Sequence, residues 1–72
     1  MTIGQRAFLV IHDMASQKGI TFQKECENLN IDRSMPGYWK RGSCNPRSYA
    51  LQQMALMGYD VIYILTGEKN EI

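Results

Sequence analysis

The segment that most constrains the fold is residues 21–42, where two short helical patterns are separated by a turn at Asn30. Asn is one of the few residues other than Gly that tolerate the left-handed conformation in which helices often end. Apolar residues recur at helical spacing on both sides of this turn: Phe22, Cys26 and Leu29, then Ile31, and then Tyr38 or Trp39. The pattern predicts two short helices that meet at a sharp corner, a helix-turn-helix.

The second helix of this pair has two possible starts. Asp32 is a suitable N-cap, but Pro36 would then remove the first hydrogen bond inside the helix. If Ser34 is the cap, Pro36 lies in the first turn, where its missing N–H is harmless, and Asp32 and Arg33 belong to the turn. We expect this later start.

Three further helices are predicted, and 72 residues are enough for one domain, so we expect a single all-α domain over residues 1–72. The first helix covers residues 2–18 and ends at Gly19. The fourth helix runs from Arg47 or Ser48 to Met57, and the last helix, capped by Asp60, covers residues 61–65. The first helix of the pair described above covers residues 22–29, with Thr21 as its N-cap. The expected core stripes are Ala7, Leu9 or Val10, Ile11, Met14 and Ala15 in the first helix, and Tyr49, Leu51, Met54, Ala55 and Met57 in the fourth. The fold class is a compact bundle of about five short helices.

Two stretches resemble the lambda-repressor-like helix-turn-helix superfamily, and within it the repressors of temperate phages. Residues 39–46, WKRGSCNP, are similar to the Trp, basic residues, Gly and Pro that close the recognition helix in that family. Residues 58–67, GYDVIYILTG, are similar to its last short helix. The resemblance implies a CI- or Cro-type transcriptional regulator, most often a repressor, that binds an inverted-repeat operator in double-stranded DNA as a homodimer.

The resemblance also implies which residues contact DNA. The family reads bases from the start and middle of the recognition helix, which here gives Arg33, Ser34 and Tyr38. Arg33 is the best candidate because a guanidinium pairs bidentately with guanine, whereas Tyr38 is equally well explained as a core residue; Trp39 is assigned to the core. Contacts to the DNA backbone are expected from Gln23, Lys24, Lys40, Arg41, Ser43, Asn45 and Arg47. Relatives place Gln where this chain has Phe22, so Gln23 comes one residue late.

The distribution of charge agrees with this assignment better than the net charge of +1 does. Residues 32–47 carry four basic side chains and one acidic side chain, a balance of +3, whereas residues 1–31 balance at zero and residues 48–72 carry −2. Positive potential is therefore expected on the reading element.

The last predicted helix carries more apolar residues than so small a domain can bury. We expect Ile62, Tyr63 and Leu65 to form a self-complementary dimer surface, with the alternative that they cover the first helix.

Other classes of function find little support in the sequence. The chain has one histidine, His12, and two cysteines, Cys26 and Cys44, without the spacing of a metal site; Cys26 fits a small buried hydrophobe. We expect no enzyme, cofactor, metal or small-molecule substrate. The longest apolar run near the N-terminus, residues 7–11, is too short to span a membrane, so a cytoplasmic location is expected.

One alternative comes from another class, a protein-interaction module such as an antirepressor or antitoxin component. It is motivated by Phe22, Pro36 and Gly37, which depart from the usual reading surface. For the regulator itself, the sequence fits either a small Cro-like protein or the N-terminal domain of a longer repressor.

Overall fold

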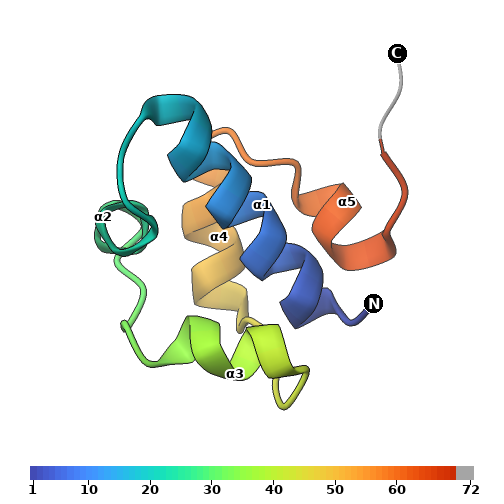
Figure 1. Ribbon diagram of the computed structural model, residues 1–72. Helices are drawn as coiled ribbons and strands as arrows, with labels where there is room; N and C mark the ends of the chain where they lie inside the picture. Colours follow the sequence, from blue (N-terminus) through green and yellow to red (C-terminus); the bar gives the residue numbers. More distant parts are fainter. Residues whose placement is uncertain (70–72) are drawn as a thin grey trace.

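The computed structural model describes residues 1–69, which form five helices and their connections, without a strand. The helices are α1 (Ile3–Lys18), α2 (Phe22–Asn28), α3 (Met35–Arg41), α4 (Ser48–Leu56) and α5 (Val61–Thr66). Helix α1 runs through the middle of the molecule, with α2 and α5 on opposite sides of it and α3 across one end (Figure 1). The predicted compact all-α bundle is confirmed. Within residues 1–69, no helix is both long enough and apolar enough to cross a membrane.

Helix α1 ends where the sequence predicts, but it begins one residue later than predicted, at Ile3, because Thr2 is its N-cap. The Thr2 hydroxyl accepts a hydrogen bond from the Gln5 backbone N–H, and the Gln5 side chain accepts one from the Thr2 N–H, which forms a capping box. Gly19 ends the helix at a φ of 70°. The predicted N-caps Thr21 and Asp60 accept hydrogen bonds at the starts of α2 and α5.

Gly4 on the inner face of α1 lets α3 approach closely. A Cβ added to Gly4 would lie 2.5 Å from the Cys44 carbonyl oxygen and 3.1 Å from the Trp39 Cα. The Gly4 N–H also donates to the Asn45 side-chain oxygen at 3.0 Å, so the same contact fixes the loop after α3. At this point only glycine fits without a shift of the backbone.

The core forms one cluster around α1, and it includes both Cys26 and Trp39, as predicted. Its buried members are Ala7, Ile11, Cys26, Leu29, Trp39, Met54, Tyr59 and Ile64. Of the two alternatives in the first helix, Val10 packs against this cluster and Leu9 is exposed.

The predicted core stripe of α4 is wrong for three residues. Tyr49 is 53% exposed, and Ala55 and Met57 are exposed as well, whereas Met54 is fully buried. Tyr49 lies in the first turn of α4, where its hydroxyl accepts a hydrogen bond from the Asn30 side chain at 2.9 Å. Its ring is thus held at the surface by a polar contact, and the core reaches only one side of this short helix.

Arg6 fastens α5 to α1. Its guanidinium donates to the carbonyl oxygens of Ile64 and Leu65, at 2.9 and 3.2 Å, and to that of Met1 at 2.8 Å. The last carbonyls of a helix have no partner within it, so a cation placed there supplies both hydrogen bonds and a favourable charge.

A buried carboxylate fastens α2. Glu25 is fully buried, and it accepts hydrogen bonds from Lys18 at 2.9 and 3.0 Å, from Asn28 at 3.2 Å and from the Tyr59 hydroxyl. Burial by itself raises the pKa of this carboxyl, but the hydrogen bonds from Tyr59, Lys18 and Asn28 outweigh burial and hold the pKa below its usual value. Burial and the contact with Glu25 raise the pKa of Tyr59. The charged carboxylate therefore links α2 to the end of α1 and to the connection before α5.

Candidate nucleic-acid interface

The corner between α2 and α3 has the predicted backbone geometry. Asn30 adopts the left-handed conformation with a φ of 58°, the only positive φ among the described residues other than glycine. Helix α3 starts at Met35 after Ser34, with Pro36 in its first turn, which confirms the later of the two starts. Asp32 lies in the turn and accepts hydrogen bonds from the Ser34 backbone N–H at 2.9 Å and the Ser34 hydroxyl at 2.7 Å. These hydrogen bonds lower the pKa of Asp32 and fix the entry into α3.

Helix α3 turns one side inward and the other outward. Pro36 and Trp39 are buried, and Trp39 is only 1% exposed. Ser34, Gly37, Tyr38 and Arg41 are exposed. Tyr38 is 44% exposed, so its alternative assignment to the core is wrong. The outward side of α3 therefore combines a hydroxyl, an open glycine, an aromatic ring and a guanidinium.

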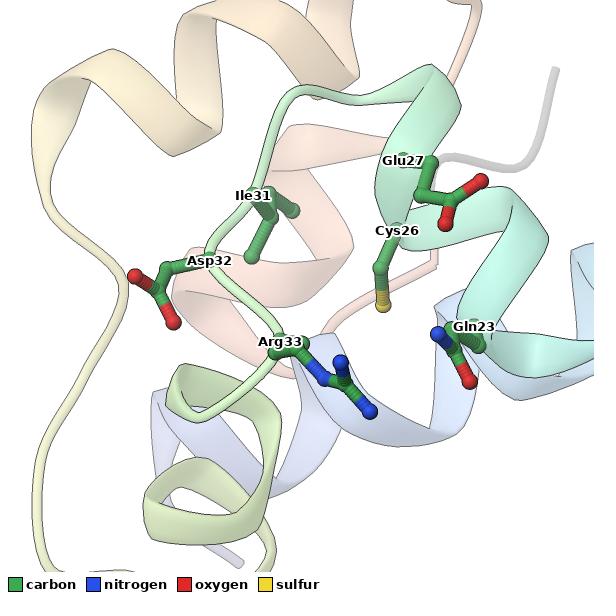
Figure 2. A pocket seen from close by; sticks show the side chains of 6 residues that line it. All are labelled: Gln23, Cys26, Glu27, Ile31, Asp32 and Arg33. Carbon is green, nitrogen blue, oxygen red and sulfur yellow. The ribbon is translucent and has the colours of Figure 1, made fainter.

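Arg33 lies across the cleft between the turn and α2. This cleft has a volume of about 310 Å³ and is lined by Gln23, Cys26, Glu27, Ile31, Asp32 and Arg33. Figure 2 shows the Arg33 side chain extending from the turn toward the part of α2 that carries Gln23, while the Asp32 carboxylate points away from it. The structure thus brings together Arg33 and Gln23, which were predicted separately as a base reader and a backbone contact.

The basic side chains of residues 32–47 are exposed, and within residues 1–69 none of them forms an ion pair. They are Arg33, Lys40, Arg41 and Arg47. Two of them lie against aromatic rings: the Lys40 ammonium is 5.6 Å from the centre of the Phe8 ring, and the Arg41 guanidinium carbon is 4.9 Å from that of Tyr38. A basic side chain without a carboxylate partner keeps its charge available to an anionic ligand.

The remaining predicted backbone contacts are scattered around α3. Gln23 and Ser43 are exposed, and Lys24 lies 3.9 Å from Glu27 in an exposed ion pair of little energetic weight. Asn45 is exposed, but its side-chain oxygen is already used to hold Gly4. Arg47 occupies the N-cap position of α4 without a capping hydrogen bond.

Helix α5 leaves two of its three predicted interface residues at the surface. Ile62 is 58% exposed and Leu65 is 41% exposed, whereas Tyr63 is half-buried. Ile64 is fully buried and belongs to the core around α1. The alternative that Ile62, Tyr63 and Leu65 cover the first helix does not hold for the exposed Ile62 and Leu65, whereas the half-buried Tyr63 is compatible with it.

Two arrangements were not predicted from the sequence, although a signal for each is present. For the contact between Arg41 and Tyr38, the signal is their spacing of three residues on one helix, which places them on the same side. The burial of Glu25 was indicated by its position between Phe22 and Leu29 on the inward face of α2. In both cases the helical spacing was considered for apolar residues only, so the polar side chain was left out.

Among residues 1–69, no group of three or more His, Cys, Asp and Glu side chains is placed to hold a metal ion. The described surface instead offers exposed basic and polar groups around one short helix. Comparison of the chain with protein-family models, with curated proteins and with solved structures yields no match.

Proposed function

We propose that this protein is a lambda-repressor-like helix-turn-helix regulator that binds operator DNA, with α3 as the recognition helix. The observation that carries this proposal is a group of four exposed basic residues that have no ion-pair partner within residues 1–69. They are Arg33, Lys40, Arg41 and Arg47, on and beside α3. Contacts between such groups and phosphates supply much of the affinity of DNA-binding proteins.

The arrangement around the turn supports the same proposal. A recognition helix must be held rigidly while its outward side stays free. Helix α3 is anchored by the buried Trp39 and by the close approach to Gly4, and the turn before it is fixed by Asp32. In this proposal Arg33 and Ser34 read base edges, while Gln23, Lys24, Ser43 and Arg47 contact the DNA backbone.

The homodimer belongs to the proposal as well. The exposed apolar residues of α5, Ile62 and Leu65, supply a surface that a second copy would cover, with Tyr63 at its edge. A symmetric dimer places two recognition helices about one turn of DNA apart, so the operator is an inverted repeat in this proposal.

Two of the three residues that motivated the alternative of a protein-interaction module are explained by the fold. Phe22 is explained by packing, since its ring lies 5.0 Å from that of Phe8, and Pro36 is buried in the first turn of α3. Gly37 remains open, because a Cβ added there would meet nothing within 4 Å.

The experiment that tests this proposal is a selection from a random pool of duplex DNA at near-physiological salt, followed by affinity measurements over a range of salt concentrations. We expect an enriched inverted repeat and affinity that falls steeply with salt. Arg47→Gln should weaken binding to all sequences and reduce the salt slope by about 1, whereas the matched control Lys69→Gln, with the same loss of charge outside residues 32–47, should change neither. If the folded protein enriches no sequence and its affinity for DNA does not change with salt, the result would support the alternative of a protein-interaction module.

A further inference from the structure

Tyr38 and Arg41 lie one turn apart on the outward side of α3. The Arg41 guanidinium carbon is 4.9 Å from the centre of the Tyr38 ring, within the range of a cation–π contact. Both residues are exposed, and neither belongs to the core cluster around Trp39. The contact therefore contributes little to packing, and its main effect is to restrict where the Arg41 guanidinium lies.

The two basic residues at the end of α3 are held in different places. The Lys40 ammonium lies over the Phe8 ring, 5.6 Å from its centre, on the side of α3 that faces α1. Arg41 instead stacks on a residue of its own helix, on the outward side. Since no carboxylate within residues 1–69 pairs with Arg41, its hydrogen-bond donors are free for a ligand that approaches this side.

The surface next to this stacked pair is open. Gly37 precedes Tyr38 directly and lies one turn before Arg41, and an added Cβ there would meet nothing within 4 Å. A ligand can therefore approach the backbone of α3 closely at this point. A guanidinium over an aromatic ring still has N–H groups that can donate to a ligand.

A guanidinium whose position is restricted by a neighbouring ring suits a ligand that presents two acceptors side by side. In the major groove of DNA that ligand is guanine, whose O6 and N7 atoms accept a bidentate pair from arginine. A phosphate can also accept a bidentate pair from arginine, but the open backbone at Gly37 lets the outward side of α3 approach base edges closely. We infer that Arg41 reads a guanine in the operator and that Tyr38 is the residue that positions it, an assignment that rests on the proposed function and replaces the backbone role predicted for Arg41.

The test is the same DNA selection repeated with four variants: Arg41→Ala, Arg41→Lys, Tyr38→Leu and Tyr38→Phe. For the unaltered protein we expect a guanine at one fixed position of each half-site. Arg41→Ala and Arg41→Lys should lose the preference at that position alone, by about 5- to 150-fold, with the other positions unchanged. Tyr38→Leu should weaken the same preference, and Tyr38→Phe, which keeps the ring, should retain it. Thermal unfolding checks that each variant folds.

A second measurement separates the base from the phosphate. Replacing that guanine by 7-deazaguanine removes the N7 acceptor, so it should weaken binding of the unaltered protein and leave Arg41→Ala unaffected. Equal losses on every sequence for the Arg41 variants would overturn the guanine-reading role while leaving a sequence-specific DNA-binding protein. Loss of the preference in Tyr38→Phe, or none in Tyr38→Leu, would overturn the role of Tyr38. An unaltered protein that enriches no sequence would overturn this inference together with the proposed function.

Discussion

Gly4→Ala is the substitution for which helix propensity and packing make opposite predictions. In an isolated helix, alanine is more favourable than glycine by about 1 kcal/mol. In this protein the new methyl group would lie 2.5 Å from the Cys44 carbonyl oxygen and 3.1 Å from the Trp39 Cα. Because both are backbone atoms, neither can move aside by a change of rotamer.

The packing effect should exceed the gain in helix propensity. Ordinary contact begins at 3.4 Å, so α1 must move away from the loop after α3, and this movement also stretches the hydrogen bond from Gly4 to Asn45. Overpacking of this kind costs about 1–3 kcal/mol, and two backbone contacts place Gly4→Ala at the upper end. After subtraction of the propensity gain we expect a net loss of about 2 kcal/mol, or a Tm lower by about 8–16 °C.

The assay is urea and thermal unfolding followed by circular dichroism. Gly37→Ala is the matched control, since the same methyl group is added to a helix where it meets nothing within 4 Å. We expect this control to raise the free energy of unfolding by about 0.5–1 kcal/mol. Stabilisation of the Gly4→Ala protein by a similar amount would refute the packing argument and show that α1 and α3 separate without cost.

Two further predictions concern buried titratable groups. The pKa of Glu25 is depressed in the folded protein, so its stabilising effect is present above the unfolded-state pKa and is lost as the pH falls through the folded-state pKa. Between about pH 7 and pH 3, the urea midpoint of the unaltered protein should therefore fall further than that of Glu25→Gln, and parallel curves would contradict this account. Burial, and then the charge of Glu25, raise the pKa of the Cys26 thiol to about 11. At about pH 8 an alkylating reagent should modify the partly exposed Cys44 first and Cys26 only on unfolding, which mass spectrometry would show; equal rates would mean that α2 opens readily.

The backbone of this protein is largely predictable from local signals in the sequence. Thr21 and Asp60 cap α2 and α5 as predicted, and Gly19 ends α1. Asn30 marks the corner before α3. These signals act over a few residues, so they can be recognised without knowledge of the tertiary structure.

Side-chain placement was less predictable, because it depends on partners that are distant in the sequence. Tyr49 looks like a core residue by its spacing but is held at the surface by Asn30. Glu25 looks like a surface residue by its chemistry but is buried, because Lys18, Asn28 and Tyr59 together satisfy its carboxylate. No rule based on one helix can supply these partners.

In the candidate site, too, one property of the side chains was predictable and another was not. The exposure of Arg33, Arg41 and Arg47 follows from their charge and could be predicted. Their directions could not, since Arg33 lies toward α2 and Arg41 lies on Tyr38. Base-reading residues must be assigned from direction as well as from position along the helix.

The contact between Arg6 and the end of α5 has a consequence for the synthesis of this protein on the ribosome. Arg6 is made 58 residues before Ile64, whose carbonyl oxygen it binds. At about 5–20 residues per second, roughly 3–12 s pass between the two, during which the side of α1 that packs on α5 has no partner. Helix α1 is made before α5, yet it is among the last of the five helices to be fully covered. Until α5 has emerged, the apolar side of α1 can contact other chains.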